Sequence, residues 1–304
     1  MDLDLSDCEE ISRSAALVVT AQIERSLIRR PRCLNGFSPS TLDPCRRLHG
    51  LGFYKHLNFD TPRLVTDDDE VDAITVVSGT AVTAELSREL ERVAEVAQPL
   101  FGNEEFVAHI HEALSEAMAN IAGHAYIKGV ERWALTLQSQ SNELNSDAPE
   151  WLRQQAKAEA LRKWWIAGHA DNQTGELLLF ALDHGHSIPV IAPFRMKDAL
   201  EEFWNANPKL KPATKSAATD AQLLEAVARA RREGYGTGRR GRGFPSMIGL
   251  VEHEAVSGAV SVISGGALYE YRKPGGDEPA TERAIPLSKK FNGTMIEWRI
   301  GGAR

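Results

Sequence analysis

The chain has 304 residues, which is enough for one large domain or two modest ones with a buried core. Hydrophobic residues make up 42% and charged residues 25%, the ordinary balance of a globular protein. The formal net charge of −7 excludes a surface that is built throughout to wrap nucleic acid. No apolar run reaches the roughly 18–20 residues of a membrane span, so we expect no membrane association.

The cysteines and the N-terminus indicate the compartment. Cys8, Cys33 and Cys45 are odd in number and match no zinc-ligand spacing, which favours idle or buried thiols in a reducing compartment. Residues 1–7 are acidic and lack the cationic start and apolar core of a signal peptide. We therefore expect a cytoplasmic protein.

The first part of the chain is predicted to form a small αβ region over residues 1–70. It contains an apolar segment at 15–23 and a helix-like stretch at 45–57. Residues 73–77 then have the composition of a strand. Residues 83–125 have helical periodicity, with these apolar residues on one face: Phe106, Ile110, Leu114, Ala117 and Ile121.

The rest of the chain alternates between strands and helices. Residues 138–175, including Trp164 and Trp165, are predicted to form a helical insertion. The other expected elements are strands at 133–137, 177–182, 259–264, 267–272 and 293–300, and helices within 198–233 and at 244–253. Over residues 71–304 this order predicts an α+β sandwich with helices on one face of a mixed sheet.

A first candidate motif lies on the long helix, where Glu116, Asn120 and His124 follow one another at intervals of four residues. An Asn oxygen suits Mg²⁺, whose remaining ligands are commonly waters and phosphates. A Glu one turn earlier can orient or deprotonate an attacking water. The alternative is a solvated helix face, because a Glu and an Asn at this spacing form a weak pattern.

A second candidate motif, Asp183 to Ser187, directly follows the buried strand at 177–182. A carboxylate at a strand end can accept a hydrogen bond from an exocyclic amine such as that of adenine. Gly185 allows a tight turn and the close approach of a flat base. An ordinary strand-to-loop turn is the alternative, and His184 with His186 forms a minor metal-binding alternative that lacks an evident third ligand.

The most glycine-dense segment, residues 234–243, precedes the helix at 244–253. Backbone N–H groups of Gly238, Gly241 and Gly243 can converge on an anion beside a helix start. Arg239, Arg240 and Arg242 add charge for phosphate contact. A flexible linker and a nucleic-acid contact through Arg239–Arg242 remain the alternatives.

A late Asn292-Gly293-Thr294 enters the last predicted strand, where a threonine hydroxyl can support a water or a base edge. Together the four motifs resemble the gyrase, histidine-kinase and MutL (GHKL) ATP-binding family, in their order and on their elements. That resemblance implies a Bergerat-type α/β sandwich that binds ATP and Mg²⁺. The N-terminal region is also similar to the STAS-like segments found beside such domains.

The resemblance assigns roles to individual residues. Asn120 matches the Mg²⁺ ligand and Glu116 the catalytic residue one turn before it. Asp183 matches the adenine-contacting aspartate and Gly185 the first glycine of that turn, with Ser187 where the second glycine is usual. The remaining ATP-binding matches are Gly238, Arg239, Gly241, Arg242, Gly243 and Thr294.

Three classes of function follow. The first is a slow Mg²⁺-dependent ATPase that switches a protein partner or a homodimer. The second is a serine or histidine kinase, although His111-Glu112 lies in the same helix as Asn120 and is badly placed for self-phosphorylation. The third is a module that binds nucleotide or nucleic acid without hydrolysis.

Overall fold

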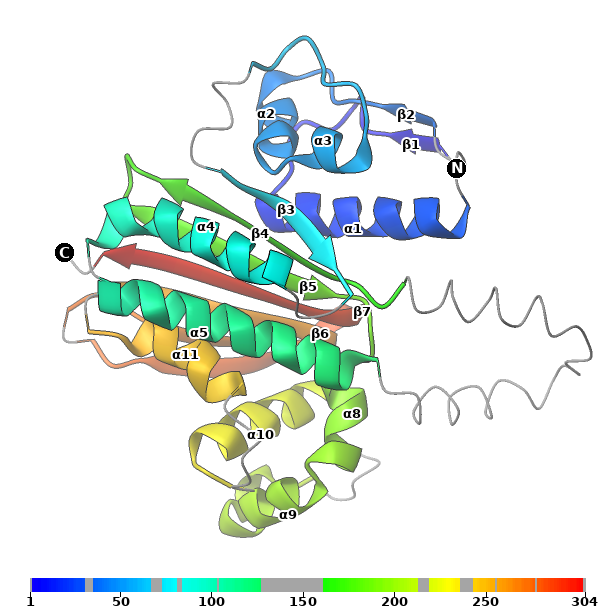
Figure 1. Cartoon of the computed structure of the whole chain (residues 1–304). Helices are drawn as coiled ribbons and strands as arrows, with labels where there is room; N and C mark the ends of the chain where they lie inside the picture. Colours follow the sequence, from blue (N-terminus) through cyan, green and yellow to red (C-terminus); the bar gives the residue numbers. More distant parts are fainter. Residues whose placement is uncertain are drawn as a thin grey trace, which may run out of the picture.

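The computed structural model describes residues 2–30, 35–66, 73–80, 84–102, 104–126, 161–212, 219–235, 243–254, 256–276 and 278–302. Within them the main sheet has the strand order β3-β4-β5-β7-β6, with every neighbouring pair antiparallel (Figure 1). Its strands are β3 (Ala73–Gly79), β4 (Trp164–Asp171), β5 (Glu176–Asp183), β6 (Val256–Lys273) and β7 (Thr281–Gly302). The predicted α+β class is confirmed, whereas the prediction of a mixed sheet is wrong. Short connections join β4 to β5 and β6 to β7, and such hairpins force antiparallel pairing.

Strand β4 lies where the sequence predicts part of a helical insertion. It pairs along its whole length with β5, so Trp164 and Trp165 belong to the central sheet. The turn that joins the two strands is stabilised by the Asp171 carboxylate, which accepts hydrogen bonds from the backbone of Gln173 at 2.9 Å and Thr174 at 3.1 Å. Pairing with β3 on one side and β5 on the other thus makes residues 164–171 a strand. The rest of the predicted insertion up to residue 160, and the predicted strand at 133–137, lie outside the described part of the chain.

One face of the sheet is covered by α4 (Ala84–Phe101), α5 (Glu104–Asn120), α10 (Asp220–Arg232) and α11 (Gly243–Glu252). The apolar face predicted for residues 106–121 is buried here, and it continues into a π-helical turn, η2 (Ile121–Ala125). The single predicted helix is divided at Gly102, whose φ of +60° ends α4. On β5, alternate residues Leu177, Leu179 and Ala181 point into this layer.

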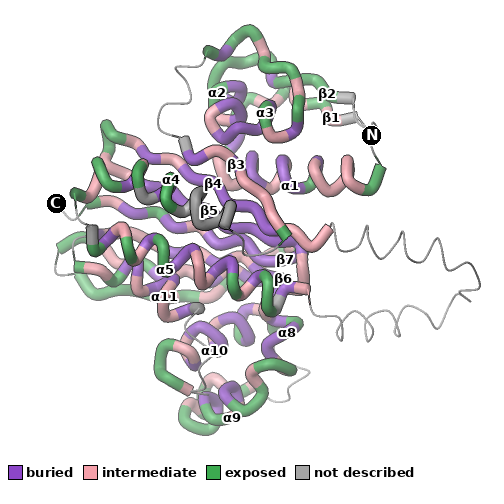
Figure 2. The backbone as a smooth tube through the Cα atoms, in the orientation of Figure 1, coloured by how far each residue is buried: buried purple, intermediate pink, exposed green. Residues whose placement is uncertain are grey.

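The opposite face is covered by the N-terminal region (Figure 1). Its elements are β1 (Asp2–Asp4), α1 (Arg13–Arg29), β2 (Asn35–Phe37), α2 (Leu42–Gly50) and α3 (Phe53–Leu57). Strands β1 and β2 form a separate parallel pair, and Ser12 begins α1 by accepting a hydrogen bond from the N–H of Ala15 at 3.1 Å. Helices α4, α5, α10 and α11 therefore lie on one face of the sheet, as predicted for residues 71–304, and the N-terminal region covers the other. Strand β5 is accordingly buried on both sides (Figure 2).

A partly buried carboxylate, Glu24, joins α1 to the sheet. It accepts hydrogen bonds from the His56 Nε2 at 2.9 Å, the Trp165 Nε1 at 2.6 Å and the Ser78 hydroxyl at 3.1 Å, and pairs with the Lys163 ammonium. Burial acts to raise the pKa of Glu24, but the bonds from His56, Lys163 and Trp165 outweigh it and lower the pKa to about 2. The carboxylate is therefore held in its charged form.

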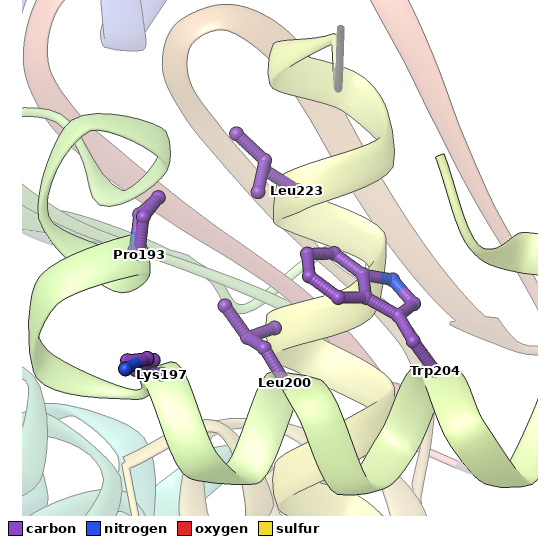
Figure 3. Close-up of a pocket in the computed structure, with 5 residues that line it drawn as sticks. All are labelled: Pro193, Lys197, Leu200, Trp204 and Leu223. Atoms are coloured by element: carbon purple, nitrogen blue, oxygen red, sulfur yellow. The ribbon is translucent and has the colours of Figure 1, made fainter. Parts of the chain in front are cut away.

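Two further helices, α8 (Ile188–Arg195) and α9 (Lys197–Ala206), pack beside α10 at one end of the molecule (Figure 1). A small apolar hollow between them is lined by Pro193, Lys197, Leu200, Trp204 and Leu223 (Figure 3). None of these residues belongs to a motif that the sequence singles out. None of the described helices is long and apolar enough to cross a membrane. Cys8 and Cys45 are free thiols, and Cys33 lies outside the described residues.

Candidate functional site

Asp183 ends strand β5 and is the most deeply buried carboxylate of the candidate site, with 2% of its surface exposed. It lies opposite Thr294 of β7 in the sheet register, and its side chain accepts the backbone N–H of Gly185 at 2.7 Å. Burial raises the pKa of Asp183 to about 7, although the N–H groups of Gly185 and Thr294 and the nearby Arg25 act to lower it. These hydrogen bonds and the Arg25 charge therefore do not fully offset the cost of burying the ionised Asp183 carboxylate.

A hydroxyl pair orients the strand next to Asp183. The Ser264 hydroxyl of β6 donates to the Gly293 carbonyl at 3.1 Å and accepts the Ile188 N–H at 2.8 Å. Its single proton is thereby used, so the Thr294 hydroxyl, 2.9 Å away, donates to Ser264. The lone pairs of the Thr294 oxygen are then available to accept a hydrogen bond beside the Asp183 carboxylate.

Two glycines allow the chain to close tightly around Asp183. A Cβ on Gly293, whose φ is +105°, would lie 2.0 Å from the Asp183 carbonyl oxygen. A Cβ on Gly185 would lie 2.2 Å from the carbonyl oxygen of Ala125. The sequence explains Gly185 by the approach of a flat base, whereas in the structure the end of η2 takes up that space.

The same contact brings the helix motif to the turn. The Ala125 carbonyl accepts the backbone N–H of His186 at 2.6 Å, and Ala125 follows Asn120 by five residues. Tyr126 adds a second link, because its hydroxyl donates to the Lys163 carbonyl at 2.6 Å and accepts the His184 N–H at 3.3 Å. These two contacts hold the C-terminal end of α5 and the following η2 against the turn that follows β5.

Glu116 and Asn120 lie one turn apart near the end of α5, and both are half-buried. Among the described residues, neither side chain has a hydrogen-bond or ion-pair partner. With no partner in the described part of the chain, a carboxamide oxygen and a carboxylate are of the type that suits a Mg²⁺ ion with its shell of waters and phosphate oxygens. Asn120 would be the direct ligand and Glu116 would face a water.

The glycine-rich segment is described only at its two ends. Gly234 has a φ of +86° and ends α10, with the Tyr235 N–H bonded to the Ala230 carbonyl at 2.9 Å. Gly243 is the first residue of α11. The predicted phosphate-contacting residues between them lie outside the described part of the chain: Gly238, Arg239, Gly241 and Arg242.

The alternative of a metal site at His184 and His186 finds little support. The His184 ring is buried, with its Nδ1 2.9 Å from the Asn292 carbonyl and its Nε2 3.2 Å from the Gln22 side-chain nitrogen. Burial lowers the pKa of His184 to about 4, so the ring is neutral at pH 7. It therefore has a packing role behind Asp183.

Sequence reasoning missed the residues that support the site. Ser264 bonds Thr294 and Tyr126 bonds the His184 backbone. Each carries a weak signal: a serine directly before Gly265-Gly266, and a tyrosine just beyond the helix motif. Ser187 is buried at the start of α8, and a Cβ on Gly265 would lie 3.1 Å from its hydroxyl. Ser187 therefore faces β6, next to the Ser264 and Thr294 pair.

In sum, the structure gathers Asp183, Gly185, Ser187 and Thr294 at one end of the sheet and ties the end of α5 to them. Chemically, the buried carboxylate can accept a hydrogen bond from an amine, and the Asn120 carboxamide oxygen is of the type that coordinates a divalent ion. Comparisons of the chain with protein-family models, with curated proteins and with solved structures found no match.

Proposed function

We propose that this protein binds Mg²⁺-ATP in a GHKL-type site and acts as a slow ATPase that switches a protein partner or a second copy of the chain. The observation that carries the proposal is the buried carboxylate of Asp183, beside the Thr294 hydroxyl and at the end of a central strand. Few structural roles require an uncompensated carboxylate at such a position. An adenine amine would supply the missing donor.

The proposed roles follow from the side chains. Asp183 accepts the exocyclic N–H of adenine, and the Thr294 oxygen accepts from the base edge or from a water that bridges to it. Asn120 holds Mg²⁺, which neutralises phosphate charge when it is bound. Glu116 orients a water toward the γ-phosphorus, so that the bond to the bridging oxygen breaks and ADP and phosphate leave.

Isothermal titration with Mg²⁺ and a non-hydrolysable ATP analogue tests the binding site. Asp183→Asn should weaken the analogue at least about 10-fold, because a hydrogen bond to a charged acceptor is replaced by a mismatched amide. Asp171→Asn is the matched control, since that aspartate ends the adjacent strand in an exposed turn. Equal affinities for the wild type and for a folded Asp183→Asn protein would overturn the assignment.

Proton release gives an independent readout of the same carboxylate. Asp183 has a pKa of about 7 in the free protein, so a fraction of the molecules carry its proton at neutral pH. An amine that donates to the carboxylate favours the charged form, and binding at pH 7 should therefore release part of a proton. Titrations in two buffers of different ionisation enthalpy measure this release, which should vanish in Asp183→Asn.

Turnover separates the ATPase from a kinase or a binding module. Incubation with γ-labelled ATP should yield labelled free phosphate, and Glu116→Gln should abolish it while the affinity for the analogue persists. Glu112→Gln is the control one turn earlier, where the side chain is exposed and bonds Ser246. Label on the protein itself would favour a kinase, and binding without either product would favour a non-hydrolysing module.

A further inference from the structure

A second cluster of ligand-type side chains lies at the other end of α5. Glu105 and His109 are four residues apart on this helix, so they share one face. His253 directly follows α11, the helix that packs along α5. One possible ligand atom from each of the three residues lies within 4.8 Å of the other two.

The histidine positions are fixed by the fold. The His253 carbonyl accepts the Lys273 ammonium of β6 at 2.6 Å, which holds the end of α11. The His253 ring lies 5.4 Å from the ring of buried Phe106 and 5.3 Å from that of His109, centroid to centroid. An imidazole of α5 therefore meets one from the end of α11, with an exposed carboxylate beside them.

The geometry needs little adjustment to bind an ion. Zinc binds histidine nitrogen and carboxylate oxygen at about 2.0–2.2 Å, so tetrahedral ligand atoms lie roughly 3.3 Å apart. The ligand atoms of the three residues lie within 4.8 Å of one another, and rotation of the exposed Glu105 side chain with small rotations of the imidazole rings can bring them to this spacing. Two histidines and one carboxylate leave a fourth position for water.

We propose that Glu105, His109 and His253 form a site for a zinc-class divalent cation that clamps α5 to the end of α11. Imidazole ligands select zinc and the neighbouring transition metals, whereas Mg²⁺ and Ca²⁺ prefer oxygen. Glu105 and Asn120 are 15 residues apart, which corresponds to about 22 Å along a helix. The site is therefore separate from the nucleotide site and does not depend on the proposed ATP binding.

Titration of the full chain with ZnCl₂, after treatment with a chelator and its removal, tests the proposal. We expect one tight site per chain, and unfolding in the presence of zinc at a higher temperature than without it. His109→Gln and His253→Gln should each lower the zinc affinity by at least about 100-fold. Even the loss of a group that only hydrogen-bonds a ligand lowers metal affinity by about 10–100-fold. Millimolar Mg²⁺ should not displace the zinc.

His111→Gln is the matched control, because His111 is exposed on the same helix, where it contacts Ser115. It should leave the zinc affinity unchanged. If His253→Gln fails to fold, the exposed Glu105→Gln replaces it, and its zinc affinity should also fall. Absence of a tight site, tight binding that survives both histidine substitutions, or an equal loss in His111→Gln would each overturn the proposal.

Discussion

The Glu24 carboxylate offers the sharpest test of how the N-terminal region is held on the sheet. Glu24→Gln keeps the size of the side chain but places an amide NH₂ where two donors already point. The partners of one carboxylate oxygen are His56 and Trp165, and those of the other are Ser78 and Lys163. Either orientation of the amide therefore sets a donor against two donors and leaves the lysine charge uncompensated.

The pKa gives the magnitude. The fold lowers the pKa of Glu24 from 4.5 to about 2, and at about 1.4 kcal/mol for each tenfold change in equilibrium constant this corresponds to about 3 kcal/mol in favour of the charged form. The carboxylate is only 16% exposed, so solvent screens little of this energy. We expect Glu24→Gln to lower the free energy of unfolding at pH 7 by about 3 kcal/mol.

The pH dependence provides a second, signed expectation. Because the folded-state pKa is lowered, the stabilisation is present above pH 4.5 and is lost as the pH falls toward about 2. The difference in stability between wild type and Glu24→Gln should therefore shrink on acidification. Urea unfolding followed by tryptophan fluorescence measures it, and Trp165 is itself a member of the network.

Glu176→Gln is the matched control, since the Glu176–Arg299 pair is exposed at 3.6 Å and should contribute no more than about 1 kcal/mol. Equal losses in Glu24→Gln and Glu176→Gln at pH 7 would refute the reasoning. A difference in the free energy of unfolding between wild type and Glu24→Gln that stays constant from pH 7 to pH 3 would refute it as well.

Other substitutions probe the site and the core. Asp183 has a folded-state pKa of about 7 against an ordinary 3.8, so urea unfolding should show wild type losing about 3 kcal/mol relative to Asp183→Asn as the pH rises from 4 to 7. Gly185→Ala forces a Cβ to 2.2 Å from a backbone oxygen and should cost at least about 2 kcal/mol, whereas Gly249→Ala, in a helix with open space around it, should stabilise by up to about 1 kcal/mol; thermal melts compare the two. Trp298→Phe removes a fully buried indole that donates to a carbonyl of α11 at 3.0 Å, and should cost about 2–3 kcal/mol in the same assay; no loss would contradict the packing described.

Much of the fold could be predicted from local patterns. The apolar face of α5 follows from its helical spacing, and the buried strand β5 follows from a short continuous apolar run between two glycine-containing turns. The sequence predicts two strands where the structure has β6, because Gly265-Gly266 looks like a break; in the structure these glycines only shift the register against β7. The two faces of the sheet could not be assigned, because an apolar run such as 177–182 does not say what covers either side.

Individual residues of the candidate site could be predicted from the sequence, but the contacts between them could not. Asp183 and Thr294 could be singled out by type and position, but their pairing depends on the register of β5 against β7, which is set by long-range contacts. Strand β4 was missed for a similar reason, as helix-forming residues precede Trp164 and only its pairing reveals a strand. Ser264 carries no catalytic pattern, and its role follows from the hydroxyl it faces.

The shared sheet has a practical consequence for dividing the chain. A boundary at residue 70 looks natural in the sequence, yet removing the segment before it would expose one whole side of β4 and β5. The apolar side chains uncovered would include Trp165, Ala167, Leu178, Phe180 and Leu182. A shortened protein of this kind should self-associate or precipitate during purification, and limited proteolysis near residue 70 should release no separately folded C-terminal fragment.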